Sequence, residues 1–208
     1  DCSEFIRSEM VGRGETFPAI ENVVVFEGDS IFEGIAYTPL SPVPERVMAD
    51  MPSNTFVANV ARSGSSINSS GSPGSYNTSL YARRATIDNA LLYPATNHIL
   101  CVGSGTNDMN SGDTATYLTN LKNYCAARRA AGWKVVVGTL LPCTYASGTF
   151  NTKRAVTNAD ALNPAHIGVY WDAVADQGGD ATYAVDGAEL NASYYPDTVH
   201  PNDTVCAG

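Results

Sequence analysis

Short apolar runs alternate along the chain with longer segments in which apolar residues recur at helical spacing. The runs are rich in Val, Ile and Leu, which is typical of buried strands. We expect strands at Asn22–Glu27, Thr55–Val60, His98–Gly103, Lys134–Leu140 and Gly168–Trp171. We expect helices between them at Glu45–Met51, Leu80–Leu92, Thr114–Ala131 and Asn151–Leu162. Strands that alternate with helices indicate a parallel sheet with crossover helices.

The helix expected at Thr114–Ala131 has the clearest pattern. Its apolar and aromatic side chains follow an i, i+3, i+4 spacing, which places them on one helix face. Gly132 follows directly, and glycine at this position is a common signal for the end of a helix.

Three of the expected strands lead directly into motifs of small and polar residues. VVVFE is followed by GDS, FVANV by ARSG, and HILCV by GSGTND. Open α/β sheets bind ligands beyond the carboxyl ends of their strands, so we expect the three motifs to face one crevice. The segment 63–79, SGSSINSSGSPGSYNTS, is a long loop of small polar residues at the end of the second strand. Loops of this length are usually functional or mobile.

Charge and composition argue against several classes of partner. The net charge is −9, and the 12 Lys and Arg residues are scattered, whereas nucleic-acid binding relies on basic clusters. No apolar run approaches the length of a membrane span. The five cysteines lack metal-ligand spacing, and Cys2 and Cys206, near the two ends, could pair.

The 208 residues contain no linker that would divide two domains, so we expect a single domain over 1–208. The chain ends eight residues after His200, which is consistent with a fragment of a longer protein.

Ser30, in the GDS motif, is a candidate nucleophile at a strand end. It does not fit the Gly-x-Ser-x-Gly nucleophile elbow, because Phe32 occupies the place of the second glycine. A serine after a strand is also an ordinary turn residue, and Asp29 could simply cap the next helix. The triplet alone therefore leaves both interpretations open.

A serine nucleophile needs a base, and the chain has three histidines. His98 begins a buried strand pattern, and His166 lies near a helix end, so structural roles are the simpler interpretation for both. His200 comes three residues after Asp197, a spacing that lets the carboxylate fold back toward the imidazole ring. The alternative for this pair is a solvated loop near the C-terminus.

Negative charge that develops on an acyl oxygen needs preorganised donors. Gly64 in ARSGSS and Asn107 in GSGTND follow strands that are expected to end at the same edge as Ser30. Gly64 could instead be a turn glycine, and Asn107 could cap a helix. The GSGT run also suggests a phosphate loop, but it lacks the P-loop lysine and the dinucleotide fingerprint, so a nucleotide-binding domain is a third-ranked alternative.

Taken in order, the segments GDSI, NVARSG, GTND and DTVH resemble the four conserved blocks of the SGNH hydrolases, also called the GDSL esterase/lipase family. Ile31 stands where the family usually has leucine, and the resemblance extends from about Val23 to Asn202. The long loop directly after Gly64 is a departure from the family pattern.

This resemblance implies a three-layer α/β/α flavodoxin-like fold with a five-stranded, mostly parallel sheet and a shallow, open active site. Ser30 would be the nucleophile, His200 the general base and Asp197 the residue that orients it. The amides of Ser30 and Gly64 and the side chain of Asn107 would form the oxyanion hole. The resemblance requires no cofactor and no metal.

The substrate class is less well determined by the sequence, because the family acts on many esters. The polar loop after Gly64 and the lack of an apolar lid favour a short-acyl esterase that acts on a small molecule or a polysaccharide, such as a carbohydrate O-acetylesterase. We expect Asp29, Ser65 and Tyr76 to contact the substrate. The alternatives are a lipase or thioesterase of the same family, or a non-catalytic carbohydrate-binding module. A secreted, cell-surface or phage-associated setting is favoured over a cytoplasmic one.

Overall fold

The computed structural model describes residues 19–34, 43–67, 79–144 and 148–202. Within them, five strands form one sheet in the order β2-β1-β3-β4-β5, and every neighbouring pair is parallel. The strands are β1 (Asn22–Gly28), β2 (Thr55–Asn59), β3 (Asn97–Gly103), β4 (Lys134–Gly138) and β5 (Ala173–Ala175). This order is the flavodoxin-like one, in which the chain switches direction across the sheet between β1 and β3. The predicted α/β fold class is confirmed.

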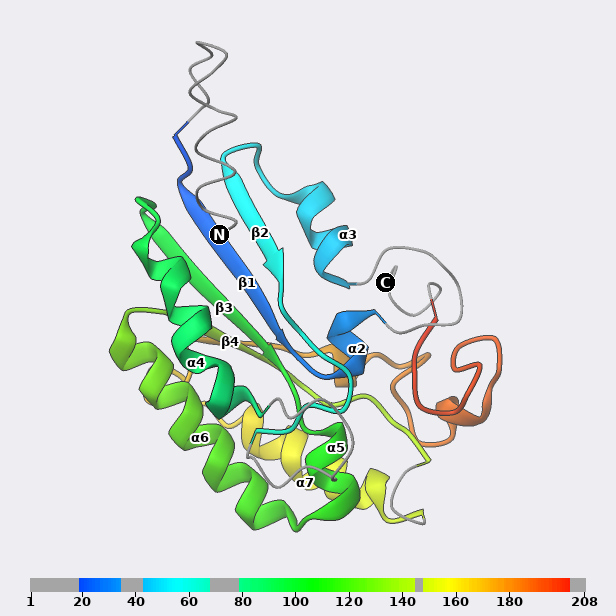
Figure 1. Cartoon of the computed structure of the whole chain (residues 1–208). Coiled ribbons are helices and arrows are strands. Elements are labelled where there is room, and N and C mark those ends of the chain that lie inside the picture. The colour runs from blue at the N-terminus through cyan, green and yellow to red at the C-terminus, as the bar shows by residue number, and fades with distance from the viewer. Residues whose placement is uncertain (1–18, 35–42, 68–78, 145–147, 203–208) are drawn as a thin grey trace.

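Helices cover both faces of the sheet (Figure 1). The longer ones are α3 (Val43–Asp50), α4 (Leu80–Asp88), α6 (Thr114–Ala131) and α7 (Phe150–Ala161), and two short ones are α2 (Ser30–Glu33) and α5 (Thr106–Ser111). Short 3-10 turns are also present at η1 (Asn89–Leu92), η3 (Gln177–Gly179) and η4 (Ala188–Leu190). The predicted helix at Leu80–Leu92 is thus an α-helix that tightens into a 3-10 turn after Asp88.

The larger core lies between the sheet and helices α4, α6 and α7. The strands contribute Val23, Val25, Leu100, Val102, Val135 and Val137. The helices contribute Leu80, Ile87, Tyr117, Leu121, Tyr124 and Phe150. These side chains are buried together because the apolar stripe of each helix faces the alternating inward positions of the strands.

A smaller core covers the opposite face of the sheet. Val24 and Phe26 of β1 pack there with Phe32 of α2 and Ala61. Because successive strand residues point to opposite faces, the apolar run of β1 is buried on both sides. The sheet therefore forms the middle of three layers.

The fifth strand is a correction to the sequence prediction, which placed it at Gly168–Trp171. That run forms a turn, in which Gly168 has φ +79° and its N–H donates to the carbonyl of Trp171. Trp171 is fully buried in the larger core, and the pairing with β4 begins only at Ala173. A short apolar run does not distinguish a strand from a turn that inserts a core side chain.

In the described parts of the chain, no helix is long and apolar enough to cross a membrane.

Candidate active site

Ser30 lies where β1 ends and α2 begins, at the carboxyl edge of the sheet. Asp29 is the N-cap of α2, and its Oδ1 accepts a hydrogen bond from the Ile31 N–H at 3.1 Å. The N–H of Asp29 donates to the carbonyl of Gly103 at 3.1 Å, which ties the serine turn to the end of β3. Ser30 is 7% exposed, so little of the residue is in contact with solvent.

The structure brings His200 and Asp197 to this serine across 170 positions of sequence. His200 Nε2 lies 2.8 Å from Ser30 Oγ, and His200 Nδ1 lies 2.6 Å from Asp197 Oδ2. Asp197 Oδ1 accepts hydrogen bonds from the N–H groups of Val199 at 3.0 Å and His200 at 2.7 Å. The three side chains form one continuous hydrogen-bonded line.

The carboxyl group of Asp197 is held in its ionised form. Partial burial acts to raise its pKa, but the hydrogen bonds from the His200 main chain, the His200 ring and the Val199 main chain outweigh that effect and lower the pKa below its ordinary value. An ionised carboxylate at this place orients the imidazole ring and stabilises a positive charge on it.

Gly64 lies in a turn that is joined to the serine segment. The N–H of Arg62 donates to the carbonyl of Gly28 at 3.0 Å, and the N–H of Ser65 closes the turn onto the carbonyl of Arg62. Gly64 has φ +73°, in the left-handed region that favours glycine. The predicted oxyanion glycine therefore follows a segment that is bonded to the end of β1.

Asn107 lies in the first turn of α5, which follows β3, and it contacts the segment that contains Gly64. Its Nδ2 donates to the main-chain carbonyl of Ser65 at 3.0 Å. The next residue, Asp108, accepts the N–H of Ile67 at 3.1 Å. The amide side chain thus lies beside the residue that follows Gly64, and two consecutive residues of α5 hold the 64–67 segment in place.

Two carboxyl groups near the site, those of the buried Asp29 and the half-buried Asp108, have raised pKa values. Burial raises the pKa of Asp29 to about 6, against hydrogen bonds from Ile31 and Thr106 and the charge of His200, which lower it. Burial also raises the pKa of Asp108 to about 7, with the Ile67 hydrogen bond opposing it and the charge of Asp29 adding to it. Each upward shift reflects the burial of a carboxyl group, and the backbone N–H groups that these carboxyl groups accept oppose it.

The residues predicted to contact substrate have different positions. Asp29 and Ser65 are each 1% exposed, which leaves their side chains very little surface to offer a ligand. Both hold structure, since Asp29 caps α2 and Ser65 accepts hydrogen bonds from Asn107 and Arg83. Tyr76 lies outside the described residues, as do Cys2 and Cys206.

Sequence analysis did not identify Arg83 of α4 as part of this region. Its guanidinium donates to the carbonyl of Val60 at 2.8 Å and lies 3.4 Å from Ser65 Oγ, and it spans from β2 to the segment after Gly64. Burial lowers the pKa of Arg83, and the nearby carboxylate of Glu27 acts in the opposite direction. No local sequence signal reveals this contact, because Arg83 and Ser65 are 18 positions apart.

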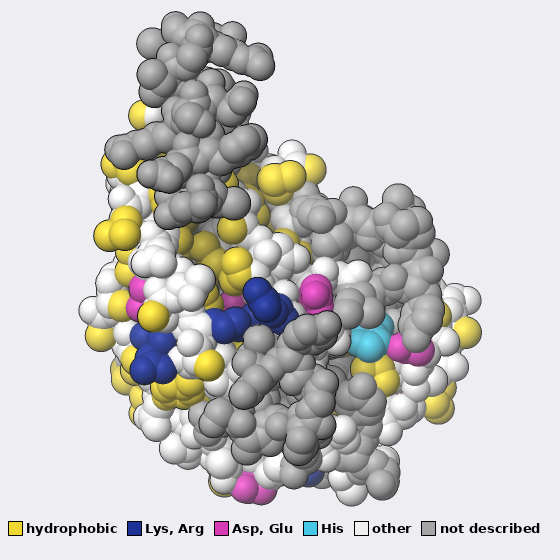
Figure 2. All heavy atoms as spheres, viewed as in Figure 1, with side chains coloured by type: hydrophobic (Ala, Val, Ile, Leu, Met, Phe, Trp, Pro, Cys, Tyr) yellow, Lys and Arg dark blue, Asp and Glu magenta, His cyan; other side chains and the backbone are white. Residues whose placement is uncertain are grey.

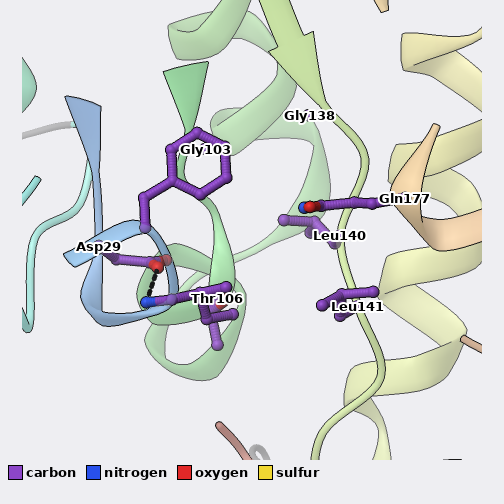
Figure 3. A pocket seen from close by; sticks show the side chains of 9 residues that line it. Asp29, Gly103, Thr106, Gly138, Leu140, Leu141 and Gln177 are labelled. Atoms are coloured by element: carbon purple, nitrogen blue, oxygen red, sulfur yellow. Dashed lines mark hydrogen bonds between the residues drawn. The ribbon is translucent and has the colours of Figure 1, made fainter. Parts of the chain in front are cut away.

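A narrow pocket lies next to the serine turn (Figure 3). Figure 3 shows Asp29 hydrogen-bonded to Thr106 on one side, with Leu140, Leu141 and Gln177 facing them from the other. The ends of β3 and β4 contribute Gly103 and Gly138. Asp29 and Ile31, which flank Ser30 in the chain, both line the pocket.

The other two histidines lie in structural surroundings. His98 Nε2 contacts the Tyr93 carbonyl at 3.1 Å, and its ring packs edge-on against Trp133. His166 Nδ1 contacts the Asp160 carbonyl at 2.8 Å and its ring packs against Trp171.

The surface next to α2 can be followed in Figure 2. In that view a histidine side chain is exposed next to acidic side chains, on the side of the molecule where α2 lies. Across the described ranges, no group of three or more His, Cys, Asp or Glu side chains is arranged to hold a metal ion.

The sheet order defines a flavodoxin-like α/β architecture, and the Ser30–His200–Asp197 line lies at the carboxyl edge of its sheet. Neither the family models nor the curated proteins include a match to the sequence. Solved structures do match, over most of the chain.

One is a lipolytic protein of the G-D-S-L family from Veillonella parvula, at 17% identity and a TM-score of 0.64, with 89% of this chain and 92% of that chain covered. Another is a catalytic mutant of an acetylxylan esterase from Geobacillus stearothermophilus, at 14% identity and a TM-score of 0.64. The match covers 93% of this chain and 92% of that chain. A putative acylhydrolase from Bacteroides fragilis matches at 18% identity and a TM-score of 0.61, with 95% of this chain and 86% of that chain covered. The chain therefore has the fold of the GDSL, or SGNH, hydrolases.

Proposed function

We propose that the protein is a serine ester hydrolase of the SGNH type, with Ser30 as nucleophile, His200 as general base and Asp197 as the residue that orients it. The observation that carries this proposal is the line of contacts from Ser30 Oγ to His200 Nε2 at 2.8 Å and from His200 Nδ1 to Asp197 at 2.6 Å. Nucleophile, base and orienting group at hydrogen-bond distance are the arrangement that activates a serine hydroxyl.

In the proposed reaction, Ser30 Oγ attacks the ester carbonyl carbon while its proton moves to His200 Nε2. Asp197 accepts the Nδ1–H hydrogen bond and stabilises the imidazolium. The carbonyl oxygen becomes an oxyanion, which the N–H groups of Ser30 and Gly64 and the Nδ2 of Asn107 receive.

The tetrahedral intermediate then collapses, and the C–O bond to the alcohol breaks as His200 returns the proton to the leaving oxygen. Water, deprotonated by His200, attacks the acyl-enzyme next. A second tetrahedral intermediate releases the carboxylic acid and restores Ser30.

We further propose that the acyl group is short, with acetyl esters of carbohydrates as the favoured class. The pocket next to the serine turn is small and is lined by Ile31, Leu140 and Leu141, and its size supports a small acyl group. The likeness to an acetylxylan esterase structure supports a carbohydrate acetyl ester among the possible short-chain substrates.

Hydrolysis of p-nitrophenyl acetate, butyrate and octanoate by the wild type and by Ser30→Ala tests the proposal. Ser53→Ala, an exposed serine between α3 and β2, is a matched control. We expect Ser30→Ala to lose activity, Ser53→Ala to keep it, and acetate to be preferred. Activity that survives in Ser30→Ala contradicts the nucleophile assignment, and a preference for octanoate points to a lipase.

Acetate release from a panel of acetylated polysaccharides tests the substrate class separately. Release of acetate from at least one of them, abolished by Ser30→Ala, supports a carbohydrate acetylesterase. Cleavage of the aryl acetate without any release from the polysaccharides contradicts that class but keeps the ester hydrolase. Tight glycan binding with no ester cleaved at all would instead support the non-catalytic carbohydrate-binding alternative.

A further inference from the structure

The loop that carries Asp197 and His200 contains an unusual backbone conformation. Thr198 has φ +67°, and among the described residues it is the only non-glycine residue with positive φ. This region is unfavourable for a β-branched side chain, because its Cβ substituents crowd the backbone. Strained residues of this kind persist only where the surrounding structure holds them, and they cluster at functional sites.

Thr144 holds Thr198 in this conformation from a distant part of the chain. The N–H of Thr144 donates to the carbonyl of Thr198 at 3.1 Å, and the two hydroxyl oxygens lie 2.7 Å apart. The N–H of Thr198 in turn donates to the carbonyl of Tyr195 at 3.2 Å. Thr144 itself is exposed, and it directly follows the buried run 141–143, which anchors its backbone.

The conformation of Thr198 determines where the next residues lie. With the chain turned at this position, the N–H groups of Val199 and His200 both point to Asp197 Oδ1. Val199 is buried in the larger core, which fixes the far side of the turn. A different φ at Thr198 would rotate these N–H groups away from the carboxylate, and with them the imidazole ring that contacts Ser30.

We propose that Thr144 and Thr198 are positioning residues, which clamp the strained turn so that His200 stays aligned between Asp197 and Ser30. This inference rests on the proposed function, and it adds Thr144, a residue with no place in the motifs of the sequence. Neither threonine takes part in the proton transfers. Their contribution is to keep His200 within hydrogen-bond reach, where small displacements lower the rate strongly.

The first test compares Thr144→Val, Thr144→Ser and the wild type in p-nitrophenyl acetate hydrolysis. Valine has the shape of threonine but lacks the hydroxyl, so we expect kcat to fall by about tenfold with KM nearly unchanged. Serine keeps the hydroxyl and should restore most of kcat. Thr119→Val, on an exposed part of α6, is the matched control and should retain wild-type kcat. Wild-type kcat in Thr144→Val would overturn the proposal.

The second test is a double-mutant cycle with Thr198→Gly. Glycine adopts the left-handed conformation without strain, so the turn should no longer depend on the clamp. We expect Thr144→Val to change kcat by less than about twofold in the Thr198→Gly background, against about tenfold in the wild-type background. Equal effects in the two backgrounds would show that Thr144 acts without Thr198 and would overturn the clamp.

A measurement without turnover separates this inference from the proposed function. The proton of the hydrogen bond between His200 Nδ1 and Asp197 should give a strongly downfield proton resonance in the NMR spectrum. We expect Thr144→Val to broaden or shift this resonance and to speed its exchange with water, while Thr144→Ser leaves it in place. An unchanged resonance in Thr144→Val overturns the clamp even if no ester is ever hydrolysed. Activity retained in Ser30→Ala would contradict the nucleophile assignment. The NMR comparison of Thr144→Val with the wild type would still test the role of Thr144.

Discussion

Asn107 Nδ2 donates a hydrogen bond to the main-chain carbonyl of Ser65 at 3.0 Å, and the two residues are 42 positions apart in the sequence. The contact joins the start of α5 to the residue that follows Gly64. One proposed oxyanion-hole donor, Asn107, is thereby bonded to the residue that follows another, Gly64.

Replacement of Asn107 by alanine should remove one oxyanion donor and this tether together. We expect kcat for p-nitrophenyl acetate to fall about 100- to 1,000-fold while KM changes little, because the donor acts mainly on the developing negative charge. Asn110→Ala, an exposed residue in the same helix, should retain wild-type kcat. A kcat for Asn107→Ala within about threefold of the wild type would contradict the assignment.

The rate of ester hydrolysis should depend on pH through His200, which must lose its proton to act as a base. Asp197, whose pKa is lowered by its hydrogen bonds, should stay ionised over the same range, whereas Asp29 and Asp108, whose pKa values burial raises to about 6 and about 7, lose their protons within it. We expect kcat/KM to rise between about pH 5 and pH 8. A flat profile over that range would contradict the role of His200.

Asp197→Asn should lower kcat by about 100- to 10,000-fold, since an amide cannot stabilise the imidazolium and favours the wrong tautomer. The control is Asp186→Asn. Asp186 is exposed and pairs with the buried Arg154, and its replacement should leave kcat unchanged. Equal losses in both variants would indicate general destabilisation rather than a role in catalysis.

Glu27, fully buried in β1, should make the protein less stable as the pH rises. Burial raises the pKa of its carboxyl group to about 7, against a hydrogen bond from Tyr124 and the charges of Arg83 and Arg128, which lower it. The folded state therefore holds a proton that the unfolded chain releases. The stabilisation is complete below 4.5, the ordinary pKa of a glutamic acid, and is lost as the pH rises toward about 7, by up to about 3 kcal/mol.

Urea denaturation of the wild type and Glu27→Gln across this pH range measures the effect. The buried carboxyl groups of Asp29 and Asp108 act in the same direction, so Glu27→Gln should reduce the decline without abolishing it. Tyr124→Phe removes a hydrogen bond that lowers the pKa of Glu27, and it should extend the decline to higher pH. Identical slopes in the wild type and Glu27→Gln would argue against a protonated Glu27.

Gly103 should not tolerate a side chain, because a Cβ there would overlap the ring of Phe32. We expect Gly103→Ala to lower the free energy of unfolding by about 1–3 kcal/mol, the usual cost of overpacking. Phe32→Leu removes the outer ring atoms, so the double variant should be more stable than Gly103→Ala alone. Additive losses in the double variant, measured by urea denaturation, would contradict this contact as the cause.

Segments with strong local signals were predicted well. The helix α6 spans Thr114–Ala131 as expected, since the Asp113 side chain caps its first turn and Gly132 ends it at φ +117°. The apolar run of β1 was equally clear, because a central parallel strand is buried on both faces. The fifth strand was misplaced, because the burial of Trp171 depends on the helices packed over it.

The amino-acid sequence by itself indicated the alternation of strands and helices and nominated Ser30, Gly64, Asn107, Asp197 and His200 through the order of their motifs. These signals are local: each depends on a residue and its near neighbours, whose propensities and turn chemistry act over a few positions. For this reason they could name candidate residues but could not give a distance between any two of them.

Only the tertiary structure decided which side chains meet. The contact of His200 with Ser30 spans 170 positions, that of Thr144 with Thr198 spans 54, and that of Arg83 with Ser65 spans 18. Such contacts form when the sheet order places the carboxyl ends of β1, β2 and β3 side by side, a result of packing over the whole chain. The left-handed conformation of Thr198 likewise depends on tertiary structure. It is locally unfavourable for a β-branched residue, and the distant contact with Thr144 holds it.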